Sequence, residues 1–269
     1  MSPLAIPLGL FIGVALGALG GGGSILTVPA LVYVLGQDPR TATTSSLLIV
    51  GLTSLIALVP HSRAGRVRFG QGLMFGALGT TGSFAGSALA SRVAPQVLLT
   101  AFAGLMLVVA TLMFRRSLRP GAVGSSEDPT AEPILTFHPL TCACSRLAKV
   151  VLTATAVGLI TGFFGVGGGF VLVPALVLAL SFPMPVAVGT SLLVIAVNSA
   201  TALTARLSAG APDLDWALIA GFTAAAIVGS LFGGRITSGV EPRHLTRAFA
   251  VLLVAVALYT AARSIPALF

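Results

Sequence analysis

The stretch Gly20-Gly21-Gly22-Gly23-Ser24-Ile25-Leu26-Thr27-Val28-Pro29-Ala30-Leu31 decides the fold. It places four consecutive glycines inside an apolar run that would otherwise form a membrane helix. Each glycine costs about 0.5–1 kcal/mol of helix stability relative to alanine. The cluster therefore predicts a helix break, which a membrane protein tolerates only where protein buries the break or where it lines a cavity.

The same motif returns 145 residues later, in the second half of the chain. Its second copy is Gly165-Val166-Gly167-Gly168-Gly169-Phe170-Val171-Leu172-Val173-Pro174-Ala175-Leu176. Beyond the glycines, residues 42–48 align with residues 187–193 at the same offset. The chain is therefore predicted to be an internal duplication.

The composition is that of a membrane protein. The chain has 269 residues, of which 56% are hydrophobic and only 8% are charged, whereas soluble domains carry roughly 25% charged residues. The net charge of +8 comes from 15 basic and 7 acidic residues, most of which lie between apolar segments. We interpret this charge as orienting the chain in a lipid bilayer rather than as binding nucleic acid.

These features predict an all-α polytopic membrane protein with eight transmembrane units. Four spans per repeat keep the orientation of the repeat, so two parallel four-span repeats are expected. Repeat 1 is predicted at residues 1–115 and repeat 2 at residues 147–269, joined by a cytosolic, partly disordered linker at residues 116–146 that is rich in Pro, Ser, Thr and charge. The predicted spans are residues 4–35, 41–60, 70–90, 96–114, 150–180, 186–205, 216–234 and 245–262.

Two geometries are open for the first span of each repeat, which contains the glycine break. In the first geometry, the helix crosses the bilayer and unwinds near its middle, because the two apolar halves together match one bilayer thickness of about 30 Å. In the second, the chain turns back as a re-entrant hairpin. Ten basic residues on one side against five on the other predict that both termini and the linker are cytoplasmic, in an inner-membrane, multi-pass protein.

The glycine breaks are the candidate substrate site. The half-helix after each break directs free N–H groups and the positive end of its dipole toward the break, an arrangement that suits an anion. The glycines spaced by four, Gly9, Gly13 and Gly17 with Gly82 and Gly86, instead indicate close helix packing. The predicted substrate-binding residues are Gly20, Gly21, Gly22, Gly23, Ser24, Ser45, Ser46, Gly165, Gly167, Gly168, Gly169, Thr190, Ser191 and Asn198.

Two arginines follow matched Gly-Ser pairs by the same interval, Arg92 and Arg235. Either could attract an anion, but snorkelling of the side chain to the membrane surface is the favoured interpretation. None of the seven acidic residues lies inside a predicted span, so a cation or proton site built on a buried carboxylate is not expected. We predict no catalytic residue, no metal and no cofactor.

At these motifs the chain resembles the TauE/SafE family of membrane permeases, the sulfite exporters. The resemblance rests on residues 17–24 with Val28-Pro29-Ala30-Leu31 and on their second copy at residues 162–176. It implies an inner-membrane transporter for small anions, such as sulfite or an organosulfonate. From the glycine breaks and the repeats we expect a secondary carrier with a midplane site between the repeats. Substrate identity and direction lie beyond the resemblance.

Several alternatives remain open at this point. The substrate could be a small carboxylate, or the protein could be a passive anion channel. A different class is an intramembrane sulfur-handling enzyme that uses Cys142 and Cys144 of the linker. Whether the protein forms a homodimer is also open.

Overall fold

The computed structural model describes residues 4–90, 95–118, 144–164, 169–208 and 214–264, which are almost entirely helical. Five of the described helices, α3, α5, α8, α9 and α10, are long and apolar enough to cross a membrane. The described elements are thus all helical, as predicted, and are consistent with a polytopic membrane protein. The elements are α1 (Ala5–Leu19), α2 (Gly22–Pro29), the π-helical turn η1 (Ala30–Val34), α3 (Pro39–Arg63), α4 (Phe69–Ala90), α5 (Pro95–Leu118), α6 (Cys144–Phe164), α7 (Gly169–Leu178), α8 (Met184–Ser208), α9 (Trp216–Ser238) and α10 (Pro242–Ser264).

The first glycine stretch turns the chain back on itself. Gly20 adopts φ 65° and ψ −111°, a backbone conformation that residues with a side chain rarely adopt. After this turn α2 runs back along α1, so that Gly23 lies against Leu16 and the carbonyl of Ile12. Leu31 then packs in one cluster with Ala5, near the start of α1. Helix α1 has 15 residues and is about 22 Å long, too short to cross the ~30 Å core of a bilayer.

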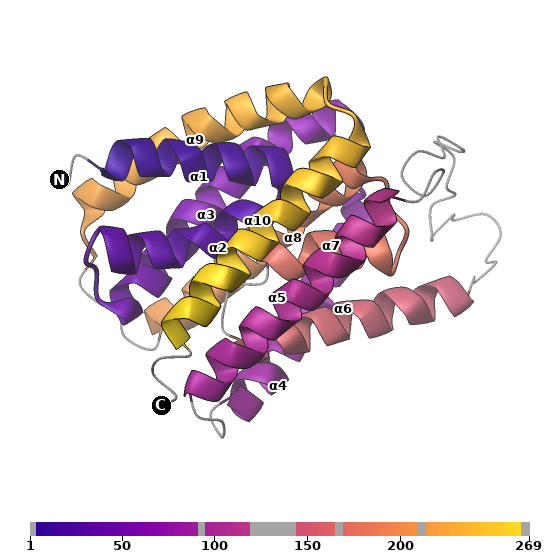
Figure 1. Ribbon diagram of the computed structural model, residues 1–269, viewed down its shortest axis with the longest axis horizontal. Helices are drawn as coiled ribbons and strands as arrows, with labels where there is room; N and C mark the ends of the chain where they lie inside the picture. Colours follow the sequence, from indigo (N-terminus) through magenta and orange to yellow (C-terminus); the bar gives the residue numbers. More distant parts are fainter. Residues whose placement is uncertain (1–3, 91–94, 119–143, 165–168, 209–213, 265–269) are drawn as a thin grey trace.

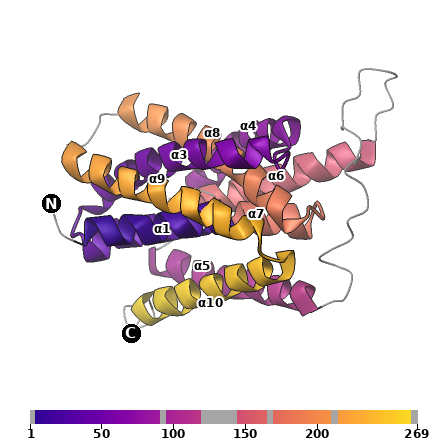
Figure 2. The ribbon, with the colours of Figure 1, turned by 90° about the horizontal axis from the view of Figure 1, so that it is seen from above.

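The predicted first crossing is therefore wrong, and the hairpin alternative describes α1 and α2. An apolar segment of this length can form either one broken crossing of the membrane or a hairpin of two half-crossings. The positive φ at Gly20 turns the chain back and so produces the hairpin. The second glycine stretch includes residues 165–168, which lie outside the described residues. On either side of it, α6 begins and α7 ends toward the same end of the bundle (Figures 1 and 2).

Helices that match in the duplication run in opposite directions. Arg206, near the end of α8, donates a hydrogen bond to the hydroxyl of Thr43, near the start of α3. Further along α3, Gly51 lies beside Ser199, seven positions before Arg206. Helices α3 and α8, which occupy equivalent places in the two halves, are therefore antiparallel. The expected parallel relation between the halves is wrong.

The hairpin explains this reversal. Because α1 and α2 leave and return at the same end of the bundle, the three long helices that follow, α3, α4 and α5, carry the chain to the opposite end (Figure 1). The second half therefore starts at the opposite end. In Figures 1 and 2, α1 begins and α10 ends at the left, which we call the terminal end. Helix α5 ends and α6 begins at the right, which we call the linker end, so the expectation that termini and linker share one side is also wrong.

The spaced glycines pack helices from the two halves against each other, as predicted. A Cβ added at Gly13 would lie 2.7 Å from Cα of Ala226 on α9, and one at Gly17 would lie 2.7 Å from Cα of Ser230. The contact positions advance together along α1 and α9, so these helices are parallel. Gly158 of α6 meets Gly79 of α4 in the same manner. Such contacts bring backbones close enough for packing to replace the hydrophobic effect that lipid does not supply.

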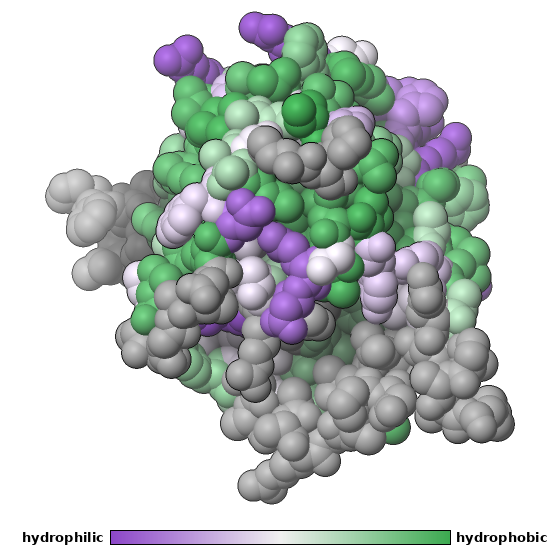
Figure 3. Space-filling model, turned by 90° about the vertical axis from the view of Figure 1, so that its left-hand side faces the viewer, coloured by the Kyte–Doolittle hydropathy of each residue, from purple (hydrophilic) through white to green (hydrophobic). Residues whose placement is uncertain are grey.

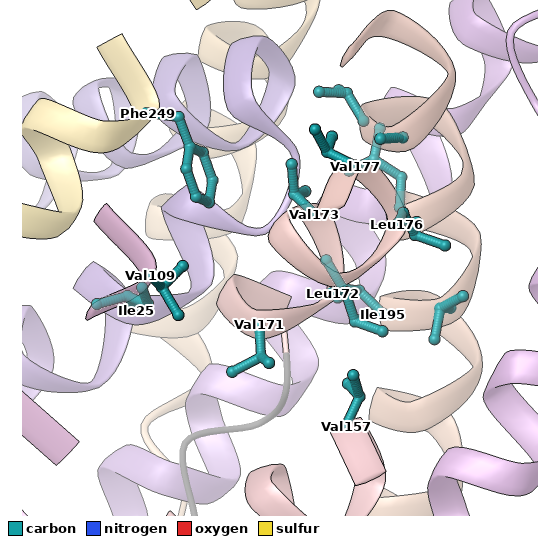
Figure 4. Packing of buried hydrophobic residues seen from close by; sticks show 14 of the residues in the cluster. Ile25, Val109, Val157, Val171, Leu172, Val173, Leu176, Val177, Ile195 and Phe249 are labelled. Atoms are coloured by element: carbon teal, nitrogen blue, oxygen red, sulfur yellow. The ribbon is translucent and has the colours of Figure 1, made fainter. Parts of the chain in front are cut away.

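Helix α7 forms the centre of the larger hydrophobic core. Figure 4 shows its valines and leucines surrounded by residues from several other helices, with Leu172 beside Ile195 of α8. A helix that is apolar on all sides is expected to be buried, and Val173 and Leu176 are indeed 0% exposed. The return arm of the second hairpin is therefore held inside protein rather than in lipid.

Candidate functional site

The beginnings of α2 and α7 meet in the interior. The backbone of Gly169, the first residue of α7, lies against the side chain of Ser24 in the first turn of α2. A Cβ added at Gly169 would also lie 3.1 Å from Cδ1 of Ile195. Positions 24 and 169 are equivalent in the duplication. The structure thus brings two sequence-predicted site residues from the two halves into contact.

The turn of the first hairpin adds a third element to this centre. A Cβ at Gly20 would lie 2.5 Å from Oγ of Ser191 and 3.3 Å from Cα of Val188, both on α8. Ser191 is fully buried. The centre is therefore formed by Gly20, Ser24, Gly169 and Ser191, and we call this set the hairpin junction.

The start of α2 is buried and has no side-chain cap. Residues 21–25 are all buried, and no side chain caps the helix at its N-cap residue, Gly21. The hydroxyl of Ser24 donates to the carbonyl of Gly21 at 2.7 Å, and that of Ser191 donates to the carbonyl of Val188 at 2.8 Å. Each hydroxyl hydrogen is thus turned toward its own helix but is free to rotate to a better acceptor.

The electrostatic character of the junction is positive. The first turn of a helix carries unsatisfied N–H groups and a partial positive charge, and two such turns face one another here. The described acidic residues, Asp38, Asp215 and Glu241, are all exposed. Among the described residues, no carboxylate therefore offsets the two helix ends in the interior.

The remaining predicted glycines divide by what they touch. Gly22 faces Leu252 of α10, where a Cβ would lie 2.9 Å from Cδ2, and Gly23 faces α1. Both glycines serve close packing around the junction. Gly21 is the N-cap of α2. The predicted residues Gly165, Gly167, Gly168 and Arg92 lie outside the described residues.

The predicted polar residues do not gather in one place. Thr190 accepts a hydrogen bond from the backbone N–H of Arg68 at 3.2 Å, in the connection between α3 and α4. Asn198 lies between α8 and α4, where Thr80 approaches its Oδ1 at 3.5 Å. Ser46 donates to the carbonyl of Thr43. The hydrogen bonds of these three residues are made with partners other than Ser24 and Gly169.

Ser45 differs from these residues because its hydroxyl is unsatisfied. Its side chain is 0% exposed, and its Oγ has no hydrogen-bond partner among the described residues. A buried hydroxyl without a partner costs roughly 1–3 kcal/mol, so it calls for a ligand or a water. Arg235, by contrast, lies exposed in the last turn of α9, at the linker end.

Sequence reasoning counted Arg206 only among the orienting charges. The structure gives it a specific position, since its guanidinium donates to Thr43 Oγ1 at 2.7 Å and approaches Thr44 Oγ1 at 3.4 Å. The duplication carried a clue, because the equivalent residue in the first half is His61, also a basic residue. The partner residues depend on the antiparallel packing of α3 and α8, which the parallel repeats expected from the sequence do not provide.

Comparison with known proteins is consistent with a transport function. Residues 5–260 match the family described as Sulfite exporter TauE/SafE. A "Probable membrane transporter protein" of Xylella fastidiosa (strain 9a5c) is 36% identical over 263 residues, covering 95% of this chain and 93% of that protein. "Probable membrane transporter protein YunE" of Bacillus subtilis (strain 168) is 26% identical over 264 residues, covering 93% of this chain and 92% of that protein. No solved structure matches the chain.

Proposed function

Because the chain belongs to the TauE/SafE sulfite exporter family of membrane transporters, we propose that it carries a small oxyanion across the bilayer through the hairpin junction. The protein is a transporter and not an enzyme. The proposed substrate is sulfite or a related sulfur-containing anion such as an organosulfonate. The proposed mechanism is secondary transport, with the anion held between the two halves of the chain.

One observation carries this proposal: the N-terminal ends of α2 and α7 face each other inside the protein, at Ser24 and Gly169. Two positive helix ends repel each other unless an anion lies between them. Backbone N–H groups and rotatable hydroxyls supply donors for the oxygens of such an anion. Sulfite and sulfonates present three oxygens, and a carboxylate presents two.

The arrangement of the halves supports an inverted-repeat transporter. In this proposal, residues 1–115 and 147–269 form repeats of opposite orientation, each with a re-entrant hairpin followed by three crossing helices. The close glycine contacts support it, because α1 packs on α9 and α4 packs on α6. Helix α1 is equivalent to α6 in the duplication, and α9 is equivalent to α4. The two contacts are therefore the same contact with the halves exchanged. Inverted repeats place substrate near the bilayer midplane, at the ends of broken helices.

We also propose that the linker end is cytoplasmic and that the terminal end faces outward, with the inner membrane as the location. Among the basic residues of the described segments, the linker end has ten and the terminal end three, so the positive-inside rule favours this orientation. The linker-end residues are Arg63, Arg66, Arg68, Arg115, Arg116, Arg146, Lys149, Arg235, Arg243 and Arg247, and the terminal-end residues are Arg40, Arg206 and Arg263.

Reconstituted transport tests the proposal. Purified protein in proteoliposomes should take up labelled sulfite, and a panel of unlabelled thiosulfate, sulfoacetate, taurine and lactate should rank competitors by affinity. Saturable uptake with countertransport indicates a carrier, whereas flux that follows the gradient without countertransport indicates a channel. Strongest competition by lactate would replace the sulfur-containing substrate with a carboxylate, and no anion flux at all would overturn the proposal.

Variants of the junction make the test specific to the site. Ser24→Ala and Ser191→Ala should each raise KM about tenfold, since a hydrogen bond to a charged group contributes about 1.5–3 kcal/mol. Ser62→Ala is the matched control, because its hydroxyl makes the same bond three residues back, to Val59, but at an exposed position. An unchanged KM in both junction variants would place the substrate elsewhere.

A further inference from the structure

Arg206 occupies an unusual electrostatic position at the terminal end. It lies in the last turn of α8, just beyond the apolar span 184–204, and reaches across to the first turns of α3. There it donates to the hydroxyl of Thr43 and approaches that of Thr44. Arg206 thus sits beside the positive end of α3, where a cation is disfavoured and an anion is favoured.

The charge of Arg206 is not neutralised by a carboxylate among the described residues. Glu241, which pairs with Arg243 and with His244, lies at the other end of the molecule. The partners of Arg206 are hydroxyl oxygens, which are neutral acceptors. Bonds from a guanidinium to an oxyanion are roughly twice as strong as bonds between neutral groups, and they can be bidentate.

We propose that Arg206, with Thr43 and Thr44, forms a second anion site at the terminal end, which docks the substrate before it reaches the hairpin junction. This inference rests on the proposed anion transport. In this step the guanidinium exchanges the Thr43 hydroxyl for two oxygens of the anion. The released hydroxyl can then donate a hydrogen bond of its own to the anion.

At the other end of the α3–α8 pair, the described residues make a different kind of contact. There the carbonyl of Arg66 lies so close to Gly189 that a Cβ would approach it at 2.5 Å, and the N–H of Arg68 binds Thr190. These two contacts with α8 are made by backbone atoms of Arg66 and Arg68. The position equivalent to Arg206 is His61, which is buried and bonded to the carbonyl of its own helix residue Ala57.

The surface of the terminal end is consistent with such a docking site. Figure 3 looks onto this end and shows hydrophilic side chains gathered in a band through a largely hydrophobic face. Thr44 is 2% exposed, whereas Arg206 is exposed. The site therefore extends from the surface, at the guanidinium, to a buried hydroxyl one turn inside α3.

The test measures KM for sulfite in right-side-out and inside-out membrane vesicles. Arg206→Gln should raise KM about tenfold in the vesicle orientation that presents the terminal end to the added anion, and less than twofold in the other. Arg206→Lys, which keeps the charge but loses the bidentate geometry, should fall between Arg206→Gln and the wild type. The matched control is Arg115→Gln, an exposed arginine of the linker end.

Ionic strength gives a second readout that a merely structural arginine would not move. The Debye length falls from about 30 Å at 0.01 M salt to about 3 Å at 1 M, so the difference in kcat/KM between wild type and Arg206→Gln should shrink as salt rises. Equal KM increases in both vesicle orientations, or a salt-independent difference in kcat/KM, would overturn the docking site.

The variants of the two sites distinguish the two proposals. A wild-type KM in Arg206→Gln together with a raised KM in Ser24→Ala would overturn the docking site and leave the junction proposal intact. Wild-type KM in both Ser24→Ala and Ser191→Ala, with Arg206→Gln impaired, would overturn the junction and retain the arginine site.

Discussion

Exchanging Ser24 and Gly169 between the two halves tests the central contact of the structure. Gly169→Ser alone should place a second hydroxymethyl group where the side chain of Ser24 already lies. A Cβ at residue 169 would be 3.1 Å from Cβ of Ser24 and 3.1 Å from Cδ1 of Ile195, closer than the 3.5–4.0 Å of ordinary carbon contacts. The double variant, Ser24→Gly with Gly169→Ser, moves the side chain to the other helix and removes the overlap.

The magnitude follows from overpacking and from the lost hydrogen bond. Overpacking costs about 1–3 kcal/mol, and about 2 kcal/mol corresponds to a fall in Tm of about 4–8 °C. Ser24→Gly alone loses the bond to Gly21 and places another glycine in a helix, which together cost about 2 kcal/mol. Because residues in contact couple by about 0.5–3 kcal/mol, the double variant should lose less stability than the sum of the two single losses.

Thermal unfolding of the four proteins in detergent completes the double-mutant cycle. Gly104→Ser is the matched control, because a Cβ at Gly104 on α5 meets nothing within 4 Å. The Tm of this variant should change by less than 2 °C, since surface changes alter stability by no more than about 0.5 kcal/mol. Sulfite uptake should also recover in part in the double variant. If the two single changes simply add, Ser24 and Gly169 do not touch, and the hairpin junction is refuted.

Three further predictions concern packing, a buried hydroxyl and orientation. Gly13→Ala should destabilise the protein by about 1–3 kcal/mol by forcing α1 from α9, whereas Gly70→Ala, with open space around it, should not lower Tm; equal Tm values would contradict the close packing. Ser54→Ala should leave Tm unchanged or raise it, since its buried hydroxyl has no partner among the described residues; a clear fall in Tm would reveal a partner. In a cysteine-free background in intact cells, an impermeant maleimide should label Asp38→Cys but not Ala64→Cys, and the reverse pattern would invert the proposed orientation.

Local patterns predicted the helix–helix contacts well. The four-residue spacing of Gly9, Gly13 and Gly17 keeps these glycines on one face of α1, so their role in close packing does not depend on the rest of the fold. That role is what the contacts with Phe222, Ala226 and Ser230 show. Such a feature can be predicted because spacing on a helix is a property of the sequence alone.

The path of the chain through each glycine break could not be predicted in the same way. Two half-helices of similar length satisfy both a broken crossing and a hairpin, and the difference is the backbone angle at Gly20. A single wrong choice there changes the number of crossings in each repeat from odd to even. The wrong choice therefore also reversed the predicted relation between the repeats and placed the termini and the linker on one side.

The candidate site was predicted in part, for a related reason. Ser24 lies against Gly169, and Ser191 lies against Gly20. The repeated motif marked these residues as site candidates, but the contacts between them depend on how the two halves pack. Asn198 was singled out because an amide within a span needs a partner, and Thr80 of α4 approaches it at 3.5 Å. Polarity within a span predicts that a side chain needs a partner, but tertiary structure decides whether that partner is substrate or protein.

The antiparallel relation of the halves also explains why equivalent residues can have different roles. In parallel repeats, positions 61 and 206 would lie on the same side of the membrane and would be exposed to the same solution. In the observed arrangement, His61 ends α3 at the linker end and Arg206 ends α8 at the terminal end. The same holds at the centre, where Ser24 fills the space that Gly169 leaves open. Divergence after duplication can therefore change one face of the transporter without changing the other.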